Sequence, residues 1–192
     1  PVVDVNSNPL NPVIGIRSFG ENPENIIRKA GLYMNGMQDN DVAAVLKHFP
    51  GHGDTDRDSH KTLPVVSHNR AQLDSIDLKP FMELIAKGAM GVMSGHLNVP
   101  ALDSNAGSVS SVSALVINDL LKNEMGFKGL VFTDALNMKG ASEKYENGKV
   151  EVMALKAGND VLLMPNDVEI AIDAIVKAID DNIRPILADV IV

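Results

Sequence analysis

The sequence contains no cysteine, which excludes disulfide bonds, thiolate catalysis and cysteine-ligated metal sites. It has no apolar stretch of the roughly 18 residues that a membrane-spanning helix requires. Positive charge is also scarce, since 17 Lys and Arg stand against 25 Asp and Glu, a formal net charge of −8. A nucleic-acid surface would need clustered Lys and Arg. We therefore expect no membrane span and no nucleic-acid partner.

The chain does have the length and apolar content of one domain with a real core. It has 192 residues, of which 45% are hydrophobic and 22% charged. Its first residues, 1–5 (PVVDV), have the pattern of the middle of a strand. We expect natural N-terminal residues to precede them, so the lack of a targeting signal does not identify the compartment.

Polar side chains are concentrated in one stretch, residues 47–60 (KHFPGHGDTDRDSH), which holds three of the five histidines. Such a run is unfavourable in a packed helix or strand, because each buried polar side chain needs a partner. Pro50 and Gly51 interrupt regular structure, and the apolar run 42–46 before them predicts a buried strand. A long loop at the end of a strand is typically functional, so this loop is the candidate active site.

Apolar runs that predict strands alternate with stretches of helical periodicity. We expect strands at residues 1–5, 42–46, 91–94, 130–133 and 161–164. We expect helices at about residues 23–37, 70–87, 113–125 and 167–179, and a further helix that ends near residue 156. This alternation is typical of a parallel α/β sheet covered on both faces. Polar residues follow the strands at the carboxyl edge, where such folds place their sites: Asp4, His48, His96 and Asp134.

Asp58 and His60 are two residues apart, so in an extended segment their side chains project to the same side. A carboxylate beside an imidazole fixes the tautomer of the ring and favours its protonated form. The pair is therefore a candidate general acid near neutral pH. The alternative is a solvated loop with an incidental contact between the two side chains.

Three basic residues are candidates for binding a ligand. Lys47 and His48 end a buried strand, so their polar tips should reach the sheet edge and meet hydroxyls or an anion. Arg17, in a loop flanked by glycine and phenylalanine, could bind a carboxylate or hydroxyls with two N–H groups. The alternatives are a Lys that extends to the surface, a core His bonded to a carbonyl, and a structural Arg bonded to loop carbonyls.

Asp134, directly after the apolar run 130–133, is the best candidate nucleophile, because carboxylates form covalent glycosyl intermediates. The alternative is a cap for the helix that follows. A metal site is the rival interpretation of the loop: Asp54, Asp56 and Asp58 imitate the start of a calcium loop, but Ser59 and Val65 stand where an EF-hand needs Gly and Glu. We expect no metal and no cofactor.

These residues carry a resemblance to glycoside hydrolase family 3, in its bacterial β-N-acetylglucosaminidase (beta-hexosaminidase) branch. The stretch 47–54 (KHFPGHGD) with 58–60 (DSH) resembles the signature of the family, and further similarity covers residues up to about 165, including 1–5 (PVVDV), 15–19 (GIRSF), 95–103, 132–138 (FTDALNM) and 157–163. The resemblance implies a TIM-like (β/α)8 barrel. Residues 1–192 would form the N-terminally incomplete catalytic domain, here its last five βα units, because a closed barrel needs eight.

The resemblance also implies retaining hydrolysis of β-linked N-acetylglucosamine, from glycans or peptidoglycan fragments. Asp134 would be the nucleophile, His60 the acid/base with Asp58 as its partner, and Arg17, Lys47 and His48 sugar-binding residues. The alternatives are a phosphorylase of the same glycosides, because a neutral base repels phosphate less than a carboxylate does, and a non-catalytic sugar-binding remnant. The expected partner is a carbohydrate substrate, and the missing N-terminal strands or another chain would cover the open edge of the sheet.

Overall fold

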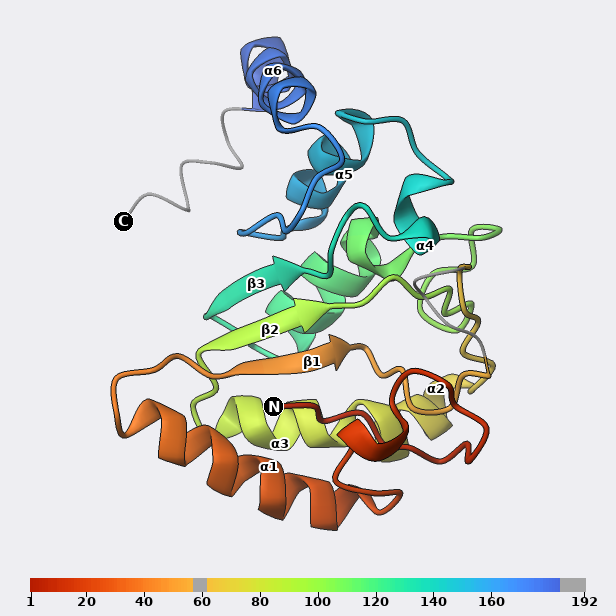
Figure 1. Ribbon diagram of the computed structural model, residues 1–192, viewed down its shortest axis with the longest axis vertical. Helices are drawn as coiled ribbons and strands as arrows, with labels where there is room; N and C mark the ends of the chain where they lie inside the picture. The colour runs from red at the N-terminus through yellow and green to blue at the C-terminus, as the bar shows by residue number, and fades with distance from the viewer. Residues whose placement is uncertain (57–61, 184–192) are drawn as a thin grey trace.

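The computed structural model describes residues 1–56 and 62–183 of the chain. At its centre lies a parallel sheet with the strand order β1-β2-β3, formed by Val45–Phe49, Gly91–Ser94 and Leu130–Thr133 (Figure 1). The predicted strands 91–94 and 130–133 are confirmed at both ends.

The first and last predicted strands are reduced to single bridges at the two edges of this sheet. Val2 pairs in parallel with Lys47 of β1, and Val161 pairs in parallel with Phe132 of β3. The five segments therefore lie in space in the order of the chain, as in a series of consecutive βα units. Longer strands at residues 1–5 and 161–164 were expected, and that expectation was wrong.

The prediction of a strand at residues 42–46 was wrong in its bounds, because β1 lies three residues further along. Val42 is half exposed, and ladder pairing with β2 begins only at Val45, opposite Gly91. The strand then continues through Lys47 and His48 to Phe49. The polar residue His48 continues a buried strand here because Asp4, which is distant in the sequence, accepts hydrogen bonds from its backbone and its ring.

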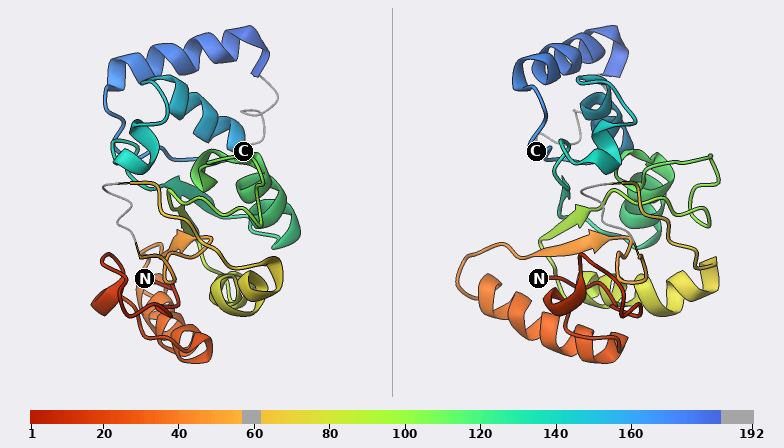
Figure 2. Two further views of the ribbon diagram at one scale, coloured as in Figure 1. Left: turned by 90° about the vertical axis from the view of Figure 1, so that its right-hand side faces the viewer. Right: turned by 45° about the vertical axis from the view of Figure 1, so that its right-hand side comes forward.

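The α-helices are α1 (Pro23–Gln38), α2 (Arg70–Gln72), α3 (Lys79–Ala86), α4 (Lys139–Ser142), α5 (Lys149–Ala157) and α6 (Val168–Ala178). Helices α1 and α3 lie next to β1, and α4, α5 and α6 lie beyond β3 (Figures 1 and 2). The helix predicted from residue 23 is confirmed, with the side chain of Asn22 accepting from the backbone N–H of Asn25. Among the described residues no helix is long and apolar enough to cross a bilayer.

The helix predicted at residues 70–87 is divided into three parts. Between α2 and α3 lies one π-helical turn, η2 (Leu73–Asp77), closed by a bond from Leu78 N–H to the carbonyl of Leu73. Pro80 in the first turn of α3 has no N–H to donate and excludes regular α-helix before it. This turn directs Asp77 into the protein, where its side chain is fully buried.

The remaining helical segments are η1 (Gly15–Arg17) and η3 (Ser110–Val112), which are 3-10 turns, and η4 (Leu115–Glu124) and η5 (Ile179–Ile183), which are π-helical. The main core joins the sheet to α1, α3 and η4, and contains an edge-to-face pair, Phe49 and Phe81, with ring centroids 5.2 Å apart. A smaller core beneath α4 and α5 includes Leu136 and Val150. The two cores fix the carboxyl edge of the sheet.

Candidate active site

Asp4 is the centre of the site. Its fully buried carboxylate accepts hydrogen bonds from the backbone N–H of His48 at 3.1 and 3.2 Å, from that of His52 at 2.8 Å, and from His48 Nδ1 at 2.8 Å. Burial alone would raise the pKa of Asp4, but its interactions with the ring and the backbone N–H of His48 outweigh this effect, so the pKa lies below its usual value. A buried, ionised Asp4 therefore holds together the edge of β1 and the loop after it.

His48 and Arg17, both candidates from the sequence, meet in the structure. Arg17 Nη2 lies 3.4 Å from His48 Nε2, and Arg17 Nη1 donates to the carbonyl of Val13 at 3.2 Å. A guanidinium only donates, so His48 Nε2 is the acceptor and Nδ1 carries the proton given to Asp4. These hydrogen bonds orient the exposed guanidinium of Arg17, and its other N–H groups can bind a ligand.

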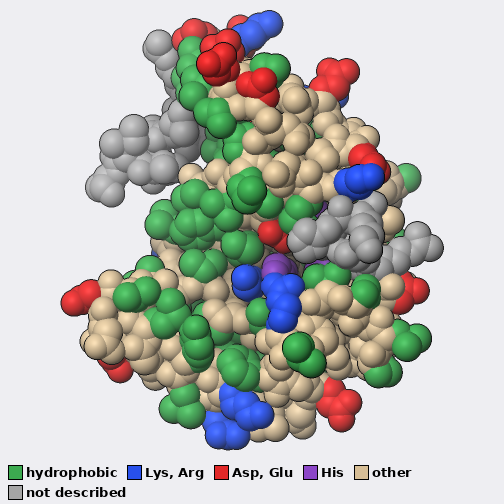
Figure 3. Space-filling view, viewed as in Figure 1, with side chains coloured by type: hydrophobic (Ala, Val, Ile, Leu, Met, Phe, Trp, Pro, Cys, Tyr) green, Lys and Arg blue, Asp and Glu red, His purple; other side chains and the backbone are tan. Residues whose placement is uncertain are grey.

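Lys47 is half-buried at the same edge. Its backbone accepts from Val3 N–H at 2.8 Å and donates to the carbonyl of Pro1 at 3.1 Å, so β1 is tied to the N-terminal segment. The peptide bonds Lys47–His48 and Phe49–Pro50 are both cis. In Figure 3, Lys and Arg side chains gather around histidine surface in the middle of one face.

His52 anchors the loop that follows β1. Its Nδ1 lies 2.7 Å from Thr55 Oγ1, which donates to the carbonyl of His52, and Asn11 Nδ2 donates to the same carbonyl at 2.7 Å. Burial lowers the pKa of His52, so its ring is neutral near pH 7. Next to it, a Cβ on Gly53 would come within 1.8 Å of the carbonyl oxygen of Val5, so only glycine fits.

Asp134 follows β3 and is half-buried. Its backbone N–H donates to the carbonyl of Ser94 at 2.8 Å, and its Oδ1 accepts from the N–H of Ala135 at 2.9 Å. The carboxylate is close enough to raise the pKa of His52 slightly against the larger effect of burial. The interpretation of Asp134 as a helix cap is wrong, because α4 begins at Lys139 with Met138 before it.

The backbone beside Asp134 is held by a buried histidine. His96 Nε2 donates to the carbonyl of Ala135 at 3.0 Å, and Nδ1 accepts from Ser111 Oγ at 2.7 Å. His96 is fully buried, so it positions the Asp134 segment from inside the protein. The predicted acid/base pair, Asp58 and His60, lies outside the described residues.

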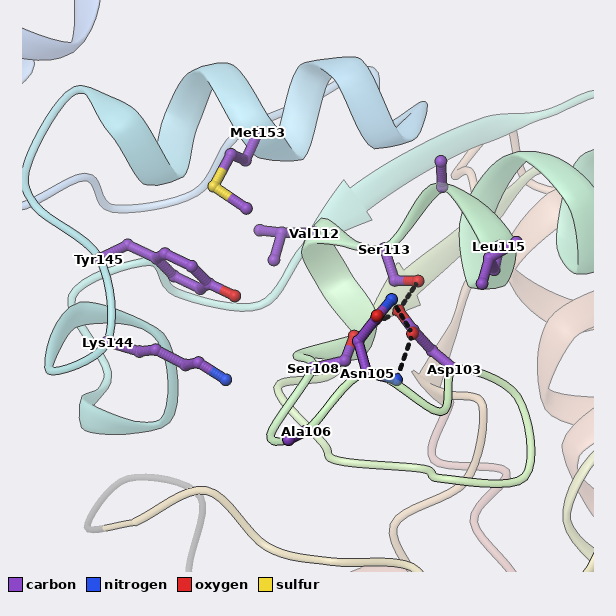
Figure 4. Close-up of a pocket in the computed structure, with 11 residues that line it drawn as sticks. Asp103, Asn105, Ala106, Ser108, Val112, Ser113, Leu115, Lys144, Tyr145 and Met153 are labelled. Atoms are coloured by element: carbon purple, nitrogen blue, oxygen red, sulfur yellow. Dashed lines mark hydrogen bonds between the residues drawn. The ribbon is translucent and has the colours of Figure 1, made fainter.

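A pocket of about 480 Å³ lies between residues 103–115, which follow β2, and the segment between α4 and α5 together with Met153 of α5 (Figure 4). Lys144 and Tyr145 face the segment that carries Asp103 and Ser108 across it. Ser108, Ser113 and Asn105 donate to Asp103, and these bonds outweigh the effect of burial and lower its pKa. Among the described residues no three His, Asp or Glu are grouped to bind a metal.

Sequence reasoning missed the residues that support the site. It placed Asp4 at the sheet edge but gave it no role, and it did not single out Asn11 or Thr55. The only local signal was that Asp4 ends an apolar run. Asn11 and Thr55 meet His52 through contacts that no sequence period encodes.

Comparison with known proteins gives consistent results. A family model described as "Glycosyl hydrolase family 3 N terminal domain" matches residues 1–186. Beta-hexosaminidase A of Pseudoalteromonas piscicida is 42% identical over 86% of this chain, which covers 29% of that protein. A family 3 β-N-acetylglucosaminidase structure from Paenibacillus sp. FPU-7 is 41% identical with a TM-score of 0.95, over 99% of this chain and 37% of that one.

A third relative, the structure of the beta-glucoside phosphorylase BglX, is 26% identical with a TM-score of 0.90 over 94% of this chain. The chain covers 34% of that protein, so it spans less than two fifths of each of these three relatives. The three parallel strands match part of a (β/α)8 domain.

Proposed function

The chain belongs to glycosyl hydrolase family 3, and from this we propose that it supplies catalytic residues of a retaining β-N-acetylglucosaminidase. The observation that carries the proposal is the meeting of Arg17, His48 and Asp4 at the carboxyl edge of the sheet that also ends in Asp134. Relatives described as beta-hexosaminidase and β-N-acetylglucosaminidase, 42% and 41% identical, support the choice of substrate.

In the proposed reaction Arg17, Lys47 and His48 bind the hydroxyls of the sugar. Asp134 attacks the anomeric carbon through one carboxylate oxygen, while His60, paired with Asp58, gives its proton to the leaving oxygen. The bond to the leaving group breaks as the bond to Asp134 forms. Water then attacks the same carbon, gives a proton to His60, and frees Asp134.

The surroundings of Asp134 suit a nucleophile. Its Oδ1 is held by the N–H of Ala135, and Oδ2 has no hydrogen bond from the described residues. Fixing one carboxylate oxygen by a backbone N–H keeps the group in one orientation, which favours attack by the other oxygen. The bond from His96 to the carbonyl of Ala135 supports the same orientation.

The test is hydrolysis of 4-nitrophenyl β-N-acetylglucosaminide by the full-length protein and by Asp134→Ala. We expect a loss of kcat of about a thousandfold or more, because the covalent route is removed. Asp74→Ala, which removes an exposed carboxylate from η2, should leave the rate unchanged. A nearly normal rate in Asp134→Ala would refute the assignment of the nucleophile.

A phosphorylase is the second candidate, favoured by the likeness to the beta-glucoside phosphorylase structure. In that case phosphate would replace water in the second step, and the product would be a sugar 1-phosphate. Adding inorganic phosphate to the assay should then raise the rate and yield this product. Sugar binding without turnover in either buffer would instead indicate a non-catalytic remnant.

A further inference from the structure

A second cluster of carboxylates and histidine lies on the other side of the loop after β1. His68 stands between two aspartates: its Nδ1 lies 2.6 Å from Asp77 Oδ2, and its Nε2 lies 3.3 Å from Asp54 Oδ2. The Asp77 side chain is fully buried, that of His68 is 14% exposed, and that of Asp54 is 31% exposed. The three residues therefore form a bridge from the interior to the surface.

The bridge joins segments that are distant in the sequence. Asp77 ends the π-helical turn η2, whereas Asp54 belongs to the loop after β1. Asp54 also accepts from Ser7 Oγ at 3.1 Å, and its carbonyl accepts from Asn8 Nδ2 at 3.2 Å. The N-terminal loop, the loop after β1 and η2 are thus connected through one imidazole.

The loop after β1 also packs directly on Asp77. A Cβ on Gly51 would lie 2.7 Å from the Cβ of Asp77, and Gly51 has a φ of +130°. Residues 51–54 are therefore held between Asp77 on one side and Asp4, which binds the N–H of His52, on the other. A displacement of Asp54 would change the position of His52.

The geometry also defines the contacts of the bridge. Each ring nitrogen of His68 faces one oxygen of an aspartate, so a single imidazole links the two side chains. Burial raises the pKa of Asp77 to about 6, and the hydrogen bond and charge of His68 counteract this rise.

We propose that His68 is a positioning residue, which fixes the loop after β1 by bridging Asp77 to Asp54 and so places His52 and His48 for the sugar. This inference rests on the proposed function. His68 would touch neither the sugar nor the reacting atoms.

The test compares variants of the full-length protein that keep one half of the bridge. His68→Asn retains a donor near the place of Nδ1, toward Asp77, but cannot reach Asp54. Asp54→Ala removes the carboxylate that faces His68 Nε2, and Asp54→Asn provides an amide oxygen in its place. Asp74→Ala, on the same π-helical turn as Asp77 but paired with exposed Arg70, is the matched control.

We expect His68→Asn and Asp54→Ala to raise KM for the chromogenic glycoside, and Kd for N-acetylglucosamine, by about tenfold or more, because small displacements of binding groups are costly. Asp54→Asn should recover most of this loss, and the control should match the wild type. Equal KM, kcat and Kd in all variants, with only a lower melting temperature, would overturn the proposal.

A measurement on the ring separates this proposal from the proposed function. In ¹⁵N-labelled protein, Asp54→Ala should shift the His68 Nε2 signal together with the amide signals of Gly51 and Gly53. If the wild type showed no turnover, the proposed function would fail while these shifts still supported the bridge. Unchanged amide signals in Asp54→Ala would overturn the bridge whatever the activity.

Discussion

Asp4 and Asp77 are two fully buried carboxylates that hold the same loop from opposite sides, yet their ionisation differs. Asp4 accepts from two backbone N–H groups and from the ring of His48, and its pKa is lowered. Asp77 accepts from the ring of His68, while its Oδ1 is buried without a partner among residues 1–56 and 62–183, and its pKa is raised to about 6. The comparison teaches that, for two carboxyl groups buried alike, the number of hydrogen-bond donors decides the direction in which the pKa shifts.

The largest effect should come from removing Asp4. Asp4→Ala would leave buried N–H groups of His48 and His52 without an acceptor, so we expect a loss of about 3–5 kcal/mol in the free energy of unfolding. Urea unfolding measures this change. Asp4→Asn keeps one acceptor oxygen and should lose less. A loss below about 1 kcal/mol in Asp4→Ala would show that the carboxylate is not the centre of the loop.

The pH dependence of stability should separate the two carboxylates. Asp77 binds its proton more tightly in the folded state, so its contribution to stability falls as the pH rises from about 4 to about 6, by about 3 kcal/mol. Asp4 contributes with the opposite sign. Because its pKa is lowered in the folded state, it stabilises the fold at pH values above its pKa in the unfolded state, and this contribution is lost as the pH falls.

Asp77→Asn tests this difference, because the amide keeps an acceptor for His68 and cannot ionise. Unfolding free energies from pH 3.5 to 7 should show a smaller fall with rising pH in Asp77→Asn than in the wild type. Asp74→Asn, an exposed neighbour on η2, is the control and should follow the wild-type curve. Parallel curves for wild type and Asp77→Asn would show that the raised pKa of Asp77 does not contribute.

The sequence predicted the elements that depend on local signals. The helix predicted from residue 23 begins there as α1, and the apolar runs of β2 and β3 gave their bounds. The predicted bounds 42–46 were wrong for β1, which ends at Phe49, because the bond that holds its polar end joins His48 to Asp4, 44 residues earlier. Such pairing depends on the fold and has no signature along the chain.

The candidate site was predicted only in part, again because some of its contacts depend on the fold and have no signature along the chain. Arg17, Lys47, His48 and Asp134 were found because they stand at strand ends or in a glycine-flanked loop. The pairing of Asp77 with His68 was missed, since it depends on a π-helical turn that an ideal helical period of 3.6 residues does not describe. A single regular helix over residues 70–87 would have given Asp77 a different direction.

A smaller effect should follow from Thr55→Val on the Asp4 side of the loop. The substitution keeps the shape of the side chain but removes the hydroxyl that binds both the ring and the carbonyl of His52. Because Thr55 is buried, we expect a loss of about 1–2 kcal/mol in urea unfolding. Thr62→Val, at an exposed position, should be neutral. Equal losses in the two variants would mean that the hydroxyl bonds of Thr55 do not stabilise the loop.

The smallest effect should come from the exposed end of the Asp77 side. Ser7→Ala removes the donor to Asp54 Oδ1, and since both side chains are partly in water we expect a loss below about 0.5 kcal/mol. A double-mutant cycle with Asp54→Ala isolates the pair. A coupling energy near zero would show that the bridge is held from its buried end, by Asp77. A coupling above about 1 kcal/mol would contradict this, because the surface contact would then stabilise the loop as much as a buried hydrogen bond does.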